Sequence, residues 1–310
     1  MHNLPKITIG LPVFNGESLL RQAIDSILSQ TFSDFELIIA DNASNDSTQE
    51  ICREYMKNDK RIQYYRHDQN KGWIFNWKFV VKQAKCEYFV YHSADDIWED
   101  TFLEKNIAIL ESKKNFIASF CKLDSFGLGY DNFKSQDVDT TMSKYYKKTR
   151  RKLRERTVYS IIGDFEEKIK FCFHKGIFGL CLYGVFRTNV LKKTIDNEGI
   201  PWDWIVVLDS LRYGDINVID EILYHRYSGG TSATNAVLRF KQGKYSLNYF
   251  LFPRIPFTNW CYKHLGKKIF FQNLDYFIKL NCSGPIMIFL GLIQIINKKI
   301  YPEKHKQNLS

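Results

Sequence analysis

The first third of the chain alternates short apolar runs with segments whose apolar side chains recur at helical spacing. The apolar runs occupy residues 6–13, 35–40, 61–66 and 86–92. The segments between them have the length of helices, and one of them, from residue 73 to about residue 84, is amphipathic. Strands that alternate with such helices are typical of a parallel sheet with helices on both faces. The pattern therefore predicts an α/β fold.

Each predicted strand is followed by a turn or a polar cluster. The residues concerned are Pro12, Asp41, Asn70 and Asp95. Because ligands of parallel sheets bind outside the carboxyl ends of the strands, we expect these residues to meet at one edge. No Gly-x-Gly-x-x-Gly follows the first strand and the sequence contains no Gly-Lys-Ser/Thr loop. Neither a dinucleotide site nor a P-loop is therefore supported.

Two adjacent carboxylates, Asp95 and Asp96, stand where the fourth strand should emerge into solvent. Neighbouring acids need a counter-charge if they are buried, and a divalent cation is the usual one. Mg²⁺ or Mn²⁺ binds carboxylate oxygens and commonly keeps substrate phosphate oxygens among its ligands. The alternative is that Asp96 caps a helix that begins at Ile97.

Five motifs in this order resemble the inverting family 2 glycosyltransferases, whose nucleotide-sugar-binding domain has the GT-A fold. The matching segments are Pro12-Val13-Phe14-Asn15, residues 29–44, Asn70-Lys71-Gly72, Ser93-Ala94-Asp95-Asp96 and Tyr183-Gly184-Val185-Phe186-Arg187. The resemblance implies a GT-A-type, Rossmann-like, mostly parallel sheet flanked by helices over residues 1–237. Within it we expect a nucleotide-sugar half at about 1–115 and an acceptor half at about 116–237.

The resemblance also implies roles for matching residues. Asp41 is expected to read the nucleobase, with Pro12 and Asn15 lining the same pocket. Asp95 is expected to bind the metal, Mg²⁺ or Mn²⁺, and Asp96 to lie near the ribose or the donor sugar. The predicted nucleotide-sugar-binding set is completed by Phe14, Asn70, Gly72 and Arg226.

One residue departs from the family pattern. Ser93 stands where the family has the first acid of its Asp-x-Asp motif. A hydroxyl is a poorer cation ligand than a carboxylate, although the diphosphate of the donor can supply the missing oxygen ligands. This difference motivates the alternative of a noncatalytic nucleotide-sugar-binding or membrane-binding protein of the same fold.

A helix is predicted from about Asp203 to Tyr213, which places Asp203 in its first turn between two tryptophans. The helix dipole alone favours an acid there. Desolvation by the flanking indole rings would instead raise its pKa and make it a better proton acceptor. The resemblance assigns Asp203 the role of general base. The implied reaction is a single displacement at the anomeric carbon, with Arg226 or His225 near the diphosphate; the alternative for His225 is a polar residue on an edge strand.

All of the net positive charge lies in the last part of the chain. Residues 238–310 hold 12 Lys and Arg against 2 Asp and Glu, a net charge of +10, which equals that of the whole chain. Its apolar run 286–296 would span about 16 Å as a helix, too short for the roughly 30 Å of hydrocarbon in a bilayer. Basic and aromatic helices suit an anionic membrane interface. The alternatives are a helical appendage that packs on the core, or a dimer contact.

The remaining composition bounds the location and the partners. Seven cysteines without a Cys-x-x-Cys indicate free thiols in a reducing compartment, and the first strand follows Met1 too closely for a signal peptide. We therefore expect a cytoplasmic protein, peripheral on the inner face of the cell membrane. The expected partners are a nucleotide-sugar donor, with a UDP-sugar favoured, and a glycan or lipid-linked glycan acceptor. No nucleic acid is expected, although a basic nucleic-acid-binding protein is a further alternative.

Overall fold

The structure is a computed structural model that describes residues 4–127, 158–175, 178–198, 201–229 and 254–282 of the chain. The chain divides into two compact units. The first comprises Met1–Glu198 and Trp202–Gly229, and the second comprises Gly199–Pro201 and Gly230–Ser310. The domain boundary expected after residue 237 stays a prediction.

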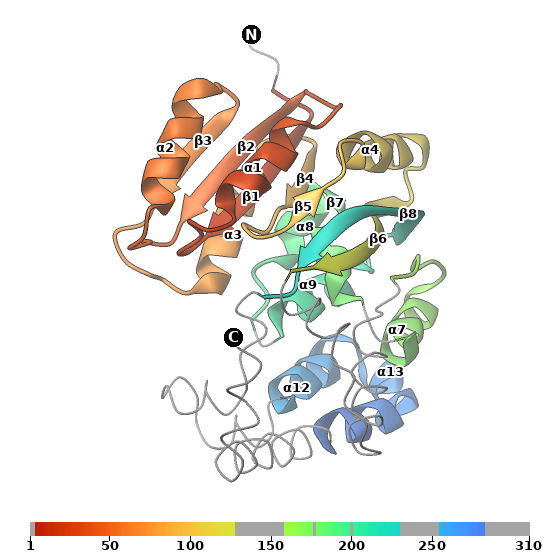
Figure 1. Cartoon of the computed structure of the whole chain (residues 1–310). Coiled ribbons are helices and arrows are strands. Elements are labelled where there is room, and N and C mark those ends of the chain that lie inside the picture. Colours follow the sequence, from red (N-terminus) through yellow and green to blue (C-terminus); the bar gives the residue numbers. More distant parts are fainter. Residues whose placement is uncertain (1–3, 128–157, 176–177, 199–200, 230–253, 283–310) are drawn as a thin grey trace, which may run out of the picture. The chain divides into compact units, whose positions relative to one another are not determined.

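A single sheet forms the centre of the first unit (Figure 1). In the described residues its strand order is β3-β2-β1-β4-β7-β6-β8-β5. β1 to β4 run parallel, β7 is antiparallel to both of its neighbours, and β5 is antiparallel to β8. The strands are β1 (Ile7–Val13), β2 (Phe35–Asp41), β3 (Ile62–Arg66), β4 (Tyr88–Tyr91), β5 (Ile97–Trp98), β6 (Phe116–Phe126), β7 (Val185–Arg187) and β8 (Asp215–Tyr227).

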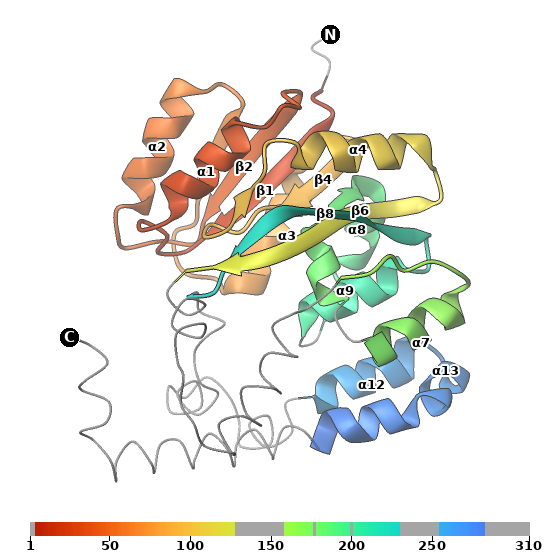
Figure 2. The same ribbon diagram turned by 45° about the vertical axis from the view of Figure 1, so that its right-hand side comes forward.

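Helices cover the sheet on both faces, which is why its central strands are mostly apolar. Every residue of β1 is buried, and all of β2 except Glu36. The chain steps from β1 to β2 to β3 and then crosses back to β4, so α1 and α2 lie on one face and α3 on the other (Figure 2). The helices of this unit are α1 (Leu20–Leu28), α2 (Thr48–Asn58), α3 (Trp73–Gln83), α4 (Phe102–Ser112), α7 (Phe165–Lys175), α8 (Thr188–Thr194), α9 (Trp202–Ser210) and the 3-10 helix η1 (Gly179–Tyr183).

The register aligns the carboxyl ends of the parallel strands. Val13 at the end of β1 pairs with Asp41, and Asp41 pairs with Arg66 at the end of β3. The loops that follow these strands therefore start side by side. This edge is where the sequence pattern predicts a ligand.

Residues 97–98 differ from one interpretation of the sequence. They form β5, which pairs with β8, and the next helix begins at Phe102 with Thr101 as its N-cap residue. The alternative in which Asp96 caps a helix beginning at Ile97 is therefore wrong. Ile97 and Trp98 form a strand instead of a helical turn because they pair with the edge of β8.

The described part of the second unit contains α12 (Ile255–His264) and α13 (Lys267–Gln272), separated by Gly266 at a φ of 96°. Its interior includes Phe257, Trp260 and Phe277, whereas Phe271 and Ile278 are exposed. None of the helices in the described ranges has the length and apolar character that crossing a membrane requires. The apolar run 286–296 lies outside the described residues.

Candidate functional site

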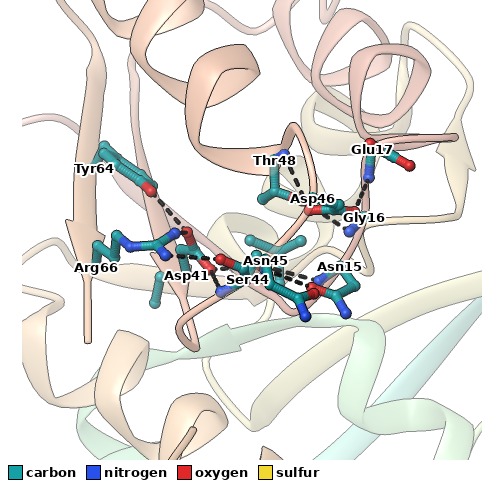
Figure 3. A network of polar contacts seen from close by, with 12 residues as sticks. Asn15, Gly16, Glu17, Asp41, Ser44, Asn45, Asp46, Thr48, Tyr64 and Arg66 are labelled. Carbon is teal, nitrogen blue, oxygen red and sulfur yellow. Dashed lines mark hydrogen bonds and ion pairs between the residues drawn. The ribbon is translucent and has the colours of Figure 1, made fainter. Parts of the chain in front are cut away.

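Asp41 organises the loop after β2. Its side chain is fully buried. Oδ1 accepts hydrogen bonds from the backbone N–H and the hydroxyl of Ser44, at 2.8 and 2.6 Å. Oδ2 accepts from the Tyr64 hydroxyl at 2.7 Å and from the Arg66 guanidinium at 2.6 Å (Figure 3). These donors, one of them a cation, compensate the loss of hydration around the carboxylate.

Asn15 joins the loop after β1 to the loop after β2. Its backbone N–H donates to the Ser44 hydroxyl at 2.9 Å, and its side-chain Oδ1 accepts from the N–H of Asn45 at 3.0 Å (Figure 3). Asn15 has a φ of 52°, a left-handed conformation that asparagine tolerates better than most residues. Pro12 is buried in β1 just before this turn, and Phe14 is exposed beside it. The structure thus brings these predicted residues to the loop that Asp41 holds.

Asn42 ties the loop after β3 to the same edge. Its Nδ2 donates to Asn70 Oδ1 at 2.9 Å, and its Oδ1 accepts from the N–H of Lys71 at 3.0 Å. The N–H of Gly72 also donates to Asn70 Oδ1, at 2.9 Å. Gly72 has a φ of 87° and directly precedes α3. Our sequence interpretation did not include Asn42; the only signal for it is its place next to Asp41.

Asp96 and Asp95 have different surroundings. Asp96 is buried and accepts from the Tyr224 hydroxyl at 2.6 Å and from the N–H of Tyr227 at 2.8 Å. Burial, followed by the charge of Asp95, raises the pKa of Asp96 to about 7. Asp95 is only half-buried and accepts from the Ser93 hydroxyl at 2.7 Å. Of the two acids, Asp95 is the one that a ligand can reach.

Four charged groups lie near enough to the phenol of Tyr183 to act on its pKa. Burial raises its pKa, the charges of Asp96, Asp203 and Asp95 raise it further, and that of Arg226 opposes them. Asp203 lies beside the 3-10 helix that ends at Tyr183. A Cβ placed on Gly179, the first residue of that helix, would be 3.0 Å from Asp203 Oδ2. The structure therefore gathers Asp95, Asp96, Asp203 and Arg226, which come from the β4–β5 loop, α9 and β8.

An aromatic row connects this acidic group to the loop of Asn70. Trp73, the first residue of α3, packs edge-on against Trp202, with ring centroids 6.2 Å apart. Trp77 contacts Trp202 at 6.5 Å and Tyr183 at 5.5 Å. Tyr183 in turn contacts Tyr224 at 5.9 Å. The row places the start of α9, and with it Asp203, next to the carboxyl edge of the parallel strands.

The tryptophan beside Asp203 is held within the protein. Trp202 is fully buried, and its indole N–H donates to the carbonyl of Ile195 at 3.1 Å. The indole of Trp204 packs against Phe178 at 5.4 Å. Asp203 itself is partly exposed in the first turn of α9, as its predicted helix position requires.

His225 is engaged on both sides of its ring. Nδ1 lies 2.6 Å from Asp124 Oδ1, and Nε2 lies 2.6 Å from Glu99 Oε1. Burial lowers its pKa, but the hydrogen bonds to Glu99 and Asp124 outweigh that effect and raise it. These contacts favour the alternative in which His225 is a polar residue that ties neighbouring strands together.

Comparison with known proteins identifies the fold and then the family. S. aureus TarS residues 1–349, solved with UDP-GlcNAc, matches with a TM-score of 0.55 and 16% identity over 74% of this chain and 61% of that one. The mannosyltransferase PcManGT of Pyrobaculum calidifontis, solved with GDP-Man and Mn²⁺, matches with a TM-score of 0.54 and 13% identity over 96% and 76%. These likenesses confirm the predicted GT-A fold.

The family follows from the sequence comparison. The profile of the family described as glycosyl transferase family 2 matches residues 8–166, about half of the chain, and the chain belongs to this family. An uncharacterized glycosyltransferase of Rickettsia typhi is 35% identical over 111 residues, which is 36% of this chain and 34% of that protein. The chain thus spans about a third of that relative's length. The predicted family is confirmed.

Proposed function

We propose that this protein transfers a sugar from a nucleoside-diphosphate sugar to a hydroxyl of a glycan or lipid-linked glycan, with inversion at the anomeric carbon. The observation that carries the proposal is the grouping of Asp95, Asp203 and Arg226 around Tyr183, next to the loops that Asp41 and Asn42 organise. Such a grouping can hold a diphosphate, a sugar and a base together.

The nucleoside end of the donor binds over the loops after β1, β2 and β3. Phe14 and Asn15 are exposed there, and Asn70 and Gly72 border them. Because both oxygens of Asp41 already have donors, it acts on the nucleobase chiefly through the loop that it positions. We favour a UDP-sugar; TarS with UDP-GlcNAc and PcManGT with GDP-Man support a nucleotide-sugar donor.

A divalent cation, Mg²⁺ or Mn²⁺, fits beside Asp95. No cluster of three or more His, Cys, Asp or Glu that could hold a metal occurs within the described ranges, and Asp96 is already bound by two protein donors. The half-buried Asp95 would therefore hold the ion, with further oxygen ligands from the diphosphate. When bound, the ion supplies positive charge against the diphosphate. The Mn²⁺ in the PcManGT structure supports this assignment.

Arg226 provides a fixed positive charge near the same place. It is half-buried, and no hydrogen bond or ion pair joins its side chain to another residue in the described parts of the chain. Its charge acts on both Asp96 and Tyr183. A guanidinium in this position binds diphosphate oxygens and stabilises the negative charge that develops on them.

Asp203 serves as the general base. As the acceptor hydroxyl oxygen bonds to the anomeric carbon, the bond from that carbon to the diphosphate oxygen breaks, and its electron pair stays with the diphosphate. Asp203 takes the proton of the acceptor hydroxyl. Attack from the face opposite to the leaving group inverts the configuration.

The second unit contacts an anionic membrane surface from the cytoplasmic side. In the described part of this unit, exposed aromatic and aliphatic side chains alternate with exposed lysines. The apolar ones include Tyr262, Phe271 and Ile278, and the lysines include Lys263, Lys267 and Lys268. Basic and aromatic helices bind such surfaces through apolar burial and attraction to anionic lipids.

A calorimetric screen tests the proposed function. UDP-, GDP-, CMP- and dTDP-sugars are titrated into the full chain with and without Mn²⁺, and each mixture is then assayed for transfer and for donor hydrolysis. We expect one donor class to bind and to be turned over. Binding without turnover would support the noncatalytic alternative, and the absence of binding to every donor would contradict the proposal.

A further inference from the structure

The hydroxyl of Tyr183 has no partner within the described residues. The side chain is partly buried, yet no described side chain or backbone group exchanges a hydrogen bond with this hydroxyl. Its aromatic neighbour Tyr224 behaves differently, since that hydroxyl donates to Asp96 at 2.6 Å. A tyrosine hydroxyl can both donate and accept a hydrogen bond, so within the described residues this group is available to a ligand.

Tyr183 is held firmly by its surroundings. Its ring packs edge-on against Trp77 at 5.5 Å and against Tyr224 at 5.9 Å. The backbone after Tyr183 is also closely packed, because a Cβ on the next residue, Gly184, would lie 2.7 Å from the carbonyl oxygen of Ser119. The hydroxyl is therefore presented at a fixed place rather than left to rotate toward an acid.

The unpaired groups around this place come from different elements. The Tyr183 hydroxyl comes from η1 and the Arg226 guanidinium from β8, and neither is bonded within the described ranges. Asp203 lies against Gly179, at the other end of η1. A ligand with charged oxygens at one end and neutral hydroxyls at the other would satisfy both unpaired groups. The guanidinium suits the charged end and the phenol suits a neutral hydroxyl.

We propose that the Tyr183 hydroxyl hydrogen-bonds an oxygen of the sugar that is transferred. The sugar ring then lies between Asp95 and Asp203, and Tyr183 helps to select which sugar the donor carries. The inference rests on the proposed function and deepens it. Tyr183 is then a substrate-contacting residue that recognises the saccharide part of the donor and not its nucleotide.

The test compares Tyr183→Phe with the wild-type full chain by calorimetry. The probes are UDP, GDP and dTDP, and the sugar nucleotides UDP-GlcNAc, UDP-glucose, GDP-mannose and dTDP-rhamnose, all with Mn²⁺. We expect the variant to bind the free nucleotide within twofold of wild type, and to bind its sugar nucleotide about three- to tenfold more weakly. Because the hydroxyl makes no bond in the described protein, the melting temperature should not change. Tyr213→Phe, an exposed tyrosine elsewhere on the first unit, is the matched control and should change nothing.

Several outcomes would overturn the inference. Equal weakening of free nucleotide and sugar nucleotide would assign Tyr183 to the diphosphate, and unchanged affinity for both would remove it from the site. A lowered melting temperature with unchanged affinity ratios would show a purely structural role. If wild type binds none of the probes, the proposed function fails together with the inference, whereas wild-type binding with an unaltered sugar preference in Tyr183→Phe overturns the inference alone.

Discussion

The hydroxyl of Tyr224 donates a hydrogen bond of 2.6 Å to Oδ2 of Asp96, although the two residues are 128 positions apart. This bond fastens β8 to the loop that carries the predicted metal ligand Asp95. The N–H of Tyr227 holds the second oxygen of the same carboxylate. A contact between Asp96 and the ribose or donor sugar stays a prediction, and the structure gives this acid a clear part in positioning its neighbours.

Asp96 makes the stability of the donor-free protein depend on pH. Its pKa is raised from an ordinary 3.8 to about 7, so the protonated form favours the folded state. Its stabilising contribution is complete below pH 3.8 and is lost as the pH rises through 7. Between pH 5 and 8 we expect the free energy of unfolding in urea to fall by roughly 3 kcal/mol through this group, with most of the fall complete by pH 7. Asp96→Asn should flatten that dependence; an equally steep profile in the variant would assign the effect to other groups.

Replacement of Asp203 by Asn should abolish transfer while leaving donor binding intact. Loss of a general base typically costs a factor of about 10² to 10⁴ in rate, and the amide keeps the size of the side chain. Turnover is followed by product formation, and the anomeric configuration of the product by NMR. Asp209→Asn is the matched control on the same helix, because Asp209 accepts from Asn197 at 2.8 Å and from Arg212 at 2.9 Å. Wild-type turnover in Asp203→Asn would remove it from the role of base, and a retained configuration would contradict inversion.

Removal of the Arg66 side chain should destabilise the nucleotide edge. Arg66→Met leaves the fully buried carboxylate of Asp41 without its cation, for which we expect a loss of about 2–4 kcal/mol in the free energy of unfolding. Nucleotide affinity should fall as well, because the loop is no longer held. Arg21→Met breaks an exposed ion pair with Glu54, which water screens, and should change the free energy of unfolding far less. Equal effects of the two variants would show that burial of Asp41 does not govern the stability of this edge.

Arg226 should matter for the diphosphate and not for the fold. We expect Arg226→Met to weaken UDP binding by about tenfold, which corresponds to one charge-assisted hydrogen bond. Its melting temperature should stay close to that of wild type, since the side chain makes no bond within the described residues. Calorimetry with UDP and with uridine separates the contribution of the diphosphate from that of the nucleoside. The loss of affinity should appear with UDP only.

The basic helices of the second unit should govern binding to anionic vesicles. Substitution of Lys263, Lys267 and Lys268 by Glu in the full chain should reduce sedimentation with phosphatidylglycerol-containing vesicles by about tenfold or more, at roughly 1 kcal/mol per lysine. Neutral phosphatidylcholine vesicles should bind weakly throughout. The control exchanges three exposed lysines of the first unit, Lys57, Lys60 and Lys114, for Glu. If both triple variants lose binding equally, the attraction is general and does not belong to the second unit.

The parallel half of the fold could be predicted because its signals are local. The runs at 6–13 and 35–40 are mostly apolar: after Lys6 only Thr8 is polar in the first, and only Glu36 in the second. Strands buried on both faces need such a composition. The position of Asp203 in a first helical turn could be predicted from equally local signals, since a turn containing Pro201 precedes it and Gly214 ends the segment. By contrast, β5 was missed because a two-residue strand has too few residues to show a period.

The partners of the site residues could not be predicted in this way. The burial of Asp41 depends on Tyr64 and Arg66, which reach it only because β3 lies beside β2 in a particular register. The pairing of Asp96 with Tyr224 depends on how β8 runs past the end of β4. Neither relation leaves a trace in spacing along the chain.

The sequence by itself determined the order of strands and helices in the parallel half of the sheet, the family, and the acids that stand at the ends of strands, because these follow from local periodicity and short motifs. Tertiary structure decided which of those acids is buried and which is open. It also decided that Tyr183, which the sequence marks only as the start of a family motif, stands near Asp95, Asp203 and Arg226. The reason is physical: the charge state and the accessibility of a side chain depend on neighbours in space, and these can come from segments far apart in the sequence, as the 128 positions between Asp96 and Tyr224 show.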